Sequence, residues 1–146
     1  MINEAETMKN KEIARKFYEL IAAKKYDEAA KLCSDDFVYY PQVSTRLEGV
    51  DKFIKLESEN MDPAGDFKME TKFIIAENDR VAVYLTFEGD LIGDEWRGAK
   101  VNNKHIYIDF MTMLRFKDGK IVEKRAKYDR YDILKQLGIQ ICELKY

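Results

Sequence analysis

Residues 116–138 read FKDGKIVEKRAKYDRYDILKQLG, and this stretch decides the fold of the C-terminal half of the chain. Its Asp118-Gly119 dipeptide is among the strongest short-range signals for a β-hairpin, because these residue types tolerate positive φ angles. The pattern predicts two strands, at residues 104–116 and 120–129, joined by this turn.

Hydrophobic periodicity places further elements around this hairpin. Apolar residues at helical spacing, with breakers such as Gly138 at the ends, predict helices at residues 5–23, 26–32, 50–61 and 131–137. A period of two predicts strands at 37–40, 67–75 and 81–87, and leaves 89–103 as a loop. We therefore expect one α+β domain over residues 1–146, with helices packed in a curved antiparallel sheet and a pocket at the open end.

Composition excludes several classes of protein. The net charge is −2 and no basic cluster is interleaved with aromatic residues, which argues against a nucleic-acid-binding protein. No apolar stretch is long enough to cross a membrane and the N-terminus is polar, so we expect a cytoplasmic protein with no membrane partner. Cys33, Cys142 and the single histidine, His105, match neither a disulfide framework nor a zinc site. No metal or cofactor is expected.

The faces of the last hairpin locate the pocket. If no bulge intervenes, Phe116 lies opposite Ile121, and Thr112 opposite Arg125. One face then carries most of the apolar residues and is predicted to meet the helices. The same face also holds Thr112, Glu123, Arg125 and Asp129. Charges on a covered face need a partner, a ligand or ordered water, so this face is predicted to line a small-molecule pocket.

Two plainer interpretations stay open for the charged residues. Glu123 and Arg125 would form a salt bridge at the rim of the sheet. Asp129 would cap the last helix, because Asp is a favoured N-cap residue. The opposite face of the hairpin is apolar enough to form a homodimer interface, with Met111, Met113, Val122, Ala126 and Tyr128 on it.

The stretch at 116–138 resembles the C-terminal signature of SnoaL-like proteins, the polyketide-cyclase-like branch of the NTF2-like superfamily. The shared features are the DGKI turn at 118–121, Asp129 and the closing QLG at 136–138. The segment at 17–41, FYELIAAKKYDEAAKLCSDDFVYYP, is similar to the opening of that family, so the likeness covers roughly residues 9–138. It implies a cone-shaped fold, frequent dimers, no metal, and Asp129 as the general acid/base of a cyclase.

One position departs from the family pattern. The cyclases tend to place an aromatic residue four positions before the Asp, whereas Arg125 stands here. A cation on that face favours a polar or anionic ligand. His105 begins a strand on the predicted outer face, where a solvated role is the default. Amphipathic aromatics are further candidates for ligand contact, namely Tyr18, Tyr40 and Trp96.

Two functions remain. The first is an enzyme that transfers protons on a small carbonyl compound, as a cyclase, isomerase or dehydratase, with Asp129 as acid/base and Arg125 or Thr112 holding a substrate oxygen. The second is a non-catalytic ligand-binding or dimerisation module. An exposed Asp129, tied only to the amides of the last helix, would favour the module.

Overall fold

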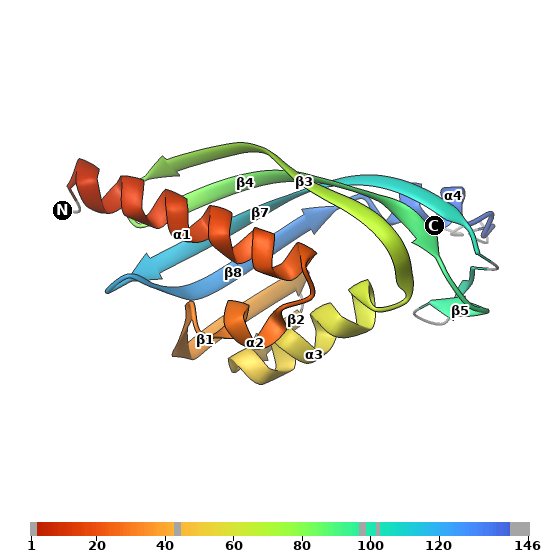
Figure 1. Cartoon of the computed structure of the whole chain (residues 1–146), viewed down its shortest axis with the longest axis horizontal. Coiled ribbons are helices and arrows are strands. Elements are labelled where there is room, and N and C mark those ends of the chain that lie inside the picture. Colours follow the sequence, from red (N-terminus) through yellow and green to blue (C-terminus); the bar gives the residue numbers. More distant parts are fainter. Residues whose placement is uncertain (1–2, 43–44, 97–98, 102, 141–146) are drawn as a thin grey trace, which may run out of the picture.

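The computed structural model describes residues 3–42, 45–96, 99–101 and 103–140, and Figure 1 shows their arrangement. The helices are α1 (Glu4–Ala22), α2 (Tyr26–Ala30), α3 (Val50–Met61) and α4 (Arg130–Gln136). The main sheet contains β1 (Cys33–Gln42), β2 (Thr45–Glu48), β3 (Ala64–Glu77), β4 (Arg80–Leu91), β7 (His105–Lys117) and β8 (Lys120–Tyr128). A second, small sheet pairs β5 (Glu95–Trp96) with β6 (Ala99–Lys100).

The main sheet has the strand order β2-β1-β8-β7-β4-β3. Its neighbouring strands are antiparallel, except that β1 runs parallel to β8. The long strands curve strongly, and α1 lies along them, while α2 and α3 lie next to β1 and β2 (Figure 1). This arrangement confirms the predicted α+β class, with helices packed against one face of a curved sheet.

The predicted hairpin at Asp118-Gly119 is present, and β3 and β4 form a second one. Asp118 and Gly119 have φ angles of 51° and 73°, as a tight turn between β7 and β8 requires. Asn78, with a φ of 52°, begins the corresponding turn between β3 and β4. The local turn chemistry therefore connects β3 with β4 and β7 with β8.

The predicted register of the last hairpin is wrong beyond its first pair. Phe116 pairs with Ile121 as expected, but Arg115 then pairs with Glu123, and Val122 is left as an extra residue. A bulge of one residue moves every later side chain of the strand to the other face. The inner face of β8 consequently carries Lys124, Ala126 and Tyr128, and the outer face carries Glu123, Arg125 and Lys127.

A second bulge reverses the faces of β3. Thr71 pairs with Leu85 and Phe73 with Tyr84, so Lys72 is the extra residue. The strand therefore starts with Phe67 and Met69 inside but ends with Phe73 and Ile75 exposed, at 65% and 69%. The period of two that predicts the strand at 67–75 implies a single apolar face along its whole length, which is wrong because periodicity does not reveal a single inserted residue.

Two segments also differ from their predicted extent. β1 starts at Cys33, so the polar run 34–36 lies within a strand, between the pairs that Cys33 and Val38 form with β8. The predicted loop at 89–103 contains the end of β4 and the small β5–β6 sheet. Long-range pairing of β1 with β8 overrides local propensity in the first segment, whereas β5 and β6 pair between residues that are close in the sequence.

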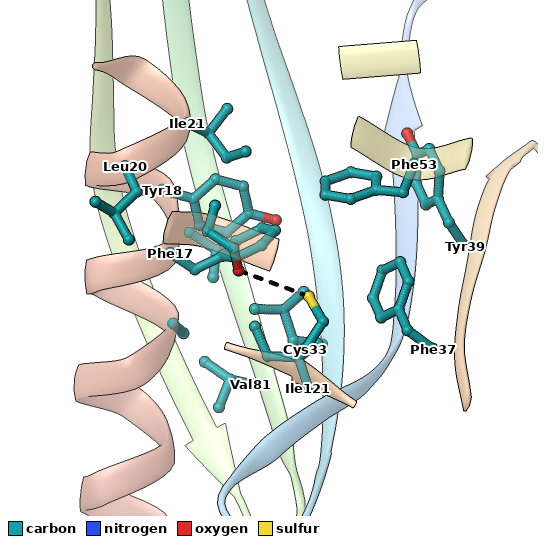
Figure 2. Close-up of a cluster of buried hydrophobic side chains, with 14 of the residues drawn as sticks. Phe17, Tyr18, Leu20, Ile21, Cys33, Phe37, Tyr39, Phe53, Val81 and Ile121 are labelled. Atoms are coloured by element: carbon teal, nitrogen blue, oxygen red, sulfur yellow. Dashed lines mark hydrogen bonds between the residues drawn. The ribbon is translucent and has the colours of Figure 1, made fainter. Parts of the chain in front are cut away.

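The buried side chains form two clusters that share the inner face of the sheet. The first lies between α1, α3 and the sheet and includes Phe17, Phe37, Phe53 and Ile121; Figure 2 shows part of it. The second lies towards α4 and includes Met61, Phe87, Ile106 and Ile133. Burial of these groups supplies most of the favourable free energy of folding.

Asp129 is exposed and begins the last helix. Its carboxylate accepts a hydrogen bond from the backbone N–H of Asp132 at 3.0 Å, which is the N-cap geometry that one interpretation of the sequence anticipated.

The cap gives a stability test. Asp129→Ala should lower the free energy of unfolding by about 0.5–2 kcal/mol, because one amide of α4 loses its acceptor. Asp129→Asn should stay close to the wild type, since Asn caps helices about as well as Asp. Urea denaturation of both variants measures the difference. Equal losses in the two variants would contradict the capping role.

Candidate functional site

A cavity lies at the boundary of the two clusters, on the inner face of the sheet. The cavity volume that is open to the centres of water molecules is about 110 Å³. A single water molecule needs about 10–15 Å³ on the same measure. Its lining is mostly apolar or aromatic and includes Ile21, Tyr39, Met69, Phe87, Ile108, Phe110, Ala126 and Tyr128. The space is therefore large enough for a small organic molecule.

Tyr18 and Thr112 form one polar point in this wall. The Tyr18 hydroxyl of α1 and the Thr112 hydroxyl of β7 are hydrogen-bonded at 2.5 Å, and both residues are buried. Burial raises the pKa of the Tyr18 hydroxyl far above its usual range, and the nearby Glu57 acts in the same direction against the hydrogen bond from Thr112. Tyr18 therefore remains a neutral phenol at physiological pH.

Lys124 and Glu57 form a second, charged point. The ammonium Nζ of Lys124 on β8 lies 3.4 Å from Glu57 Oε1 on α3, and only 3% and 8% of these residues are exposed. Four ring centroids also lie close to Nζ, at 4.5 Å for Phe53, 4.9 Å for Tyr39, 5.6 Å for Tyr18 and 5.8 Å for Phe17. A carboxylate and ring faces both attract a cation, which offsets the cost of burying the ammonium.

Figure 2 shows how these rings converge. Phe17 and Tyr18 extend from α1 towards Phe53, and Tyr39 lies beside Phe53 on the far side. The Phe17 and Phe53 rings are stacked at 5.8 Å, and the Tyr39 ring meets Phe53 edge-on at 5.1 Å. The four rings around the Lys124 ammonium thus come from three different elements, α1, α3 and β1.

Asn60 and Trp96 complete the polar part of the lining. The Oδ1 atom of Asn60 is buried and lacks a hydrogen-bond partner among the described residues. Buried amide oxygens are rarely left in this state unless water or a ligand reaches them. Trp96 reaches the cavity from β5. The cavity therefore offers a ligand both a cation and an unused acceptor.

The structure brings together three of the residues predicted to contact a ligand, namely Tyr18, Thr112 and Trp96. It places Glu123 and Arg125 on the outer face, because of the Val122 bulge, where Arg125 Nε lies 2.7 Å from Glu123 Oε1. The guanidinium carbon of Arg125 lies 3.9 Å from the centre of the Tyr40 ring, which also lies outside the cavity lining. This matches the plainer interpretation of a salt bridge.

Sequence reasoning missed the charged pair in the cavity. Glu57 had a signal, because it occupies the same face of α3 as Phe53 and Met61, at positions four residues apart. A carboxylate within an apolar stripe is unusual enough to single out. Lys124 had none, because its face depends on the bulge at Val122.

His105 and Cys33 lie outside the cavity lining. His105 contacts Asp90 at 2.7 Å and Glu88 at 3.1 Å on the outer face, and these hydrogen bonds raise its pKa. Burial raises the pKa of the Cys33 thiol to about 12, so it is protonated at neutral pH. Cys142 lies outside the described residues.

The described residues contain no group of three or more His, Cys, Asp or Glu side chains arranged to hold a metal ion. Among the same residues, no helix has the length and apolar character needed to cross a membrane.

The buried pair makes a testable prediction. Lys124→Met leaves the Glu57 carboxylate buried without a cation and should lower the free energy of unfolding by about 3–5 kcal/mol. Combining it with Glu57→Gln should recover part of that loss, since no charge then remains. Chemical denaturation of the single and double variants measures the coupling.

Glu59 provides the matched control, because it lies on the same helix in an exposed pair with Lys55 at 3.9 Å. Glu59→Gln should cost less than about 1 kcal/mol. Simple additivity of the Lys124 and Glu57 substitutions would show that the two groups do not interact.

Comparison with solved structures places the fold. AclR from Streptomyces galilaeus, a proposed hydroxylase, matches with 25% identity and a TM-score of 0.80, over 90% of this chain and 82% of that one. A proposed SnoaL-like polyketide cyclase from Jannaschia sp. CCS1 matches with 14% identity and a TM-score of 0.86, over 97% and 99%. An LEH-like epoxide hydrolase from M. tuberculosis matches with 21% identity and a TM-score of 0.71, over 90% and 91%.

These structures share the NTF2-like cone that the sequence resemblance implied. A search among curated proteins finds no match. The family model described as SnoaL-like polyketide cyclase matches residues 11–137, which is most of the chain. The protein therefore belongs to the SnoaL-like polyketide cyclase family.

Proposed function

We propose that the protein binds a small, largely apolar molecule in its cavity, with a ligand oxygen directed towards Lys124. The observation that carries this proposal is the buried ammonium, paired with Glu57, in a mostly apolar lining. Ligand pockets typically combine an apolar wall with a few placed polar groups that fix orientation. The family match and the hydrolase and cyclase names of the structural neighbours support a small-molecule pocket.

The position of the cation changes the expected ligand. With Arg125 outside, the charge that meets the ligand is the Lys124 ammonium, already balanced by Glu57. A strongly anionic ligand would be repelled by the Glu57 carboxylate at close range. A neutral oxygen such as a carbonyl or hydroxyl is favoured instead.

The acid/base role proposed for Asp129 has its own test. Its carboxylate is exposed, accepts from an amide of α4 and lies outside the cavity lining, which favours the binding function over catalysis by this residue. Asp129→Asn keeps the cap but removes the base. Once a substrate is in hand, unchanged turnover by this variant would exclude Asp129 as the catalytic group.

Ligand binding can be measured with the single tryptophan, because Trp96 lies in the cavity wall. The bicyclic ketone 2-decalone should change the Trp96 fluorescence saturably. Ala126→Phe fills the cavity and should weaken binding at least about tenfold, whereas Ala5→Phe, at an exposed position on α1, should leave it unchanged. A linear response with no saturation in the wild type would contradict the proposal.

We also propose that a second copy of the chain covers the outer face of the sheet. Adjacent strands expose Phe73, Ile75 and Met111 there, next to Tyr84 and Met113. Contiguous exposed apolar groups of this kind commonly mark an interface. The residues of this interface differ from the predicted set. Met111 and Met113 remain on the outer face, whereas Val122, Ala126 and Tyr128 are at least partly buried.

Light scattering on a sizing column tests this interface. The wild type should show twice the chain mass of 17.2 kDa. Met111→Lys should shift it to the monomer, because a buried charge at the centre of the interface lacks a partner. Met8→Lys, at an exposed position on α1, is the control and should remain dimeric. A wild type that stays monomeric throughout the micromolar range would exclude the interface.

A further inference from the structure

The cavity contains one carboxylate and one ammonium within its described lining, and they lie side by side. Glu57 and Lys124 are 3.4 Å apart, whereas the remaining lining residues are apolar or uncharged. This is the pair of groups that proton abstraction next to a carbonyl needs: a base for the C–H proton and a fixed positive charge for the oxygen.

We propose that Glu57 and Lys124 form a proton-transfer centre for ketones that enter the cavity, with Glu57 as the base and Lys124 as the oxyanion partner. This inference rests on the proposed binding function and adds a reaction to it. It assigns the base to α3 and not to the carboxylate at the start of α4.

The step balances without any further reagent. The Glu57 carboxylate takes a proton from the carbon next to the ligand carbonyl, and the C–H electron pair becomes the new C=C bond. The carbonyl π pair moves to oxygen, and the resulting enolate faces the Lys124 ammonium. The Glu57 carboxyl hydrogen exchanges with solvent, and its return to carbon restores a ketone that carries a solvent hydrogen.

The environment of Lys124 suits this electrostatic role. Its contact with Glu57 is long for a charged hydrogen bond, and the described residues supply no other acceptor to the ammonium. A lysine carries three donors, so donors remain for a ligand oxygen. The surrounding rings favour the cation over the neutral amine that an imine mechanism requires.

Water access is also restricted around this pair. Both side chains are nearly fully buried, and the wall is built from Phe53, Tyr39 and Tyr18. A fixed charge acts more strongly on a developing enolate in such surroundings than in bulk water. The neutral Tyr18–Thr112 pair adds a hydroxyl group close by without adding charge.

Deuterium exchange tests the proposal. The probe is 2-decalone in buffered D₂O, and NMR follows the loss of its α-proton signals with and without protein. The wild type should accelerate exchange above the buffer rate. Glu57→Gln should reduce that acceleration at least about 100-fold, which is the usual scale of general-base catalysis. Its Gln side chain still offers Lys124 an acceptor, so the fold should survive.

Glu59→Gln is the matched control, since it makes the same change on the exposed face of α3 and should exchange at the wild-type rate. Circular dichroism and Trp96 titration with 2-decalone establish that each variant folds and binds. The Lys124→Met/Glu57→Gln double variant, which buries no charge, should fold, bind the ketone more weakly than the wild type because the ammonium is missing, and show only the buffer rate when the ketone is saturating.

The outcomes separate the two proposals. Saturable binding by the wild type without accelerated exchange would overturn the proton-transfer centre and leave the binding function in place. No saturable binding would overturn both. Exchange that persists in Glu57→Gln but disappears in Asp129→Asn would move the base to Asp129. A borohydride-trapped adduct on Lys124 would replace the oxyanion role with imine chemistry.

Discussion

The contact between the Lys124 ammonium, the Glu57 carboxylate and four aromatic rings is the interaction on which the rest of the site depends. A buried ammonium is costly unless opposite charge and polarisable neighbours surround it. Those neighbours come from α1, α3 and β1, so the same contact fixes how the helices meet the sheet. It also leaves an ammonium group in a mostly apolar cavity, and this group is expected to orient a ligand oxygen towards Lys124.

Two inserted residues determine which side chains take part. Val122 in β8 turns Lys124, Ala126 and Tyr128 towards the helices, and Lys72 in β3 turns Phe73 and Ile75 to the outside. Without the first bulge, Arg125 and Glu123 would lie inside and the cavity would carry different charges. One residue per strand therefore decides both the polarity of the cavity and the apolar character of the outer face.

The sequence was sufficient for the four helices, for the long strands and for the fold class, but not for the short strands β2, β5 and β6. Helical spacing located α1 and α3, the Asp118-Gly119 dipeptide located the last turn, and both agree with the structure. The β7 side of the cavity was also predictable, because alternation along that strand is unbroken and Thr112 faces inward. The β8 side was not, since a bulge depends on how neighbouring strands twist and pair. Glu57 could have been found from its place in an apolar helical stripe, whereas its partner Lys124 could not.

The reactivity of two lysines tests the central claim most directly. Lys124 is buried on the inner face of β8, and Lys127 is exposed on the outer face. The folded protein is treated briefly with the N-hydroxysuccinimide ester of acetic acid. Fragmentation mass spectrometry then identifies the acetylated lysines and gives the acetylation rate of each. Lys127 should react quickly, and Lys124 should stay protected until denaturant unfolds the chain. Equal rates in the folded protein would contradict the bulged register and, with it, the charged pair in the cavity.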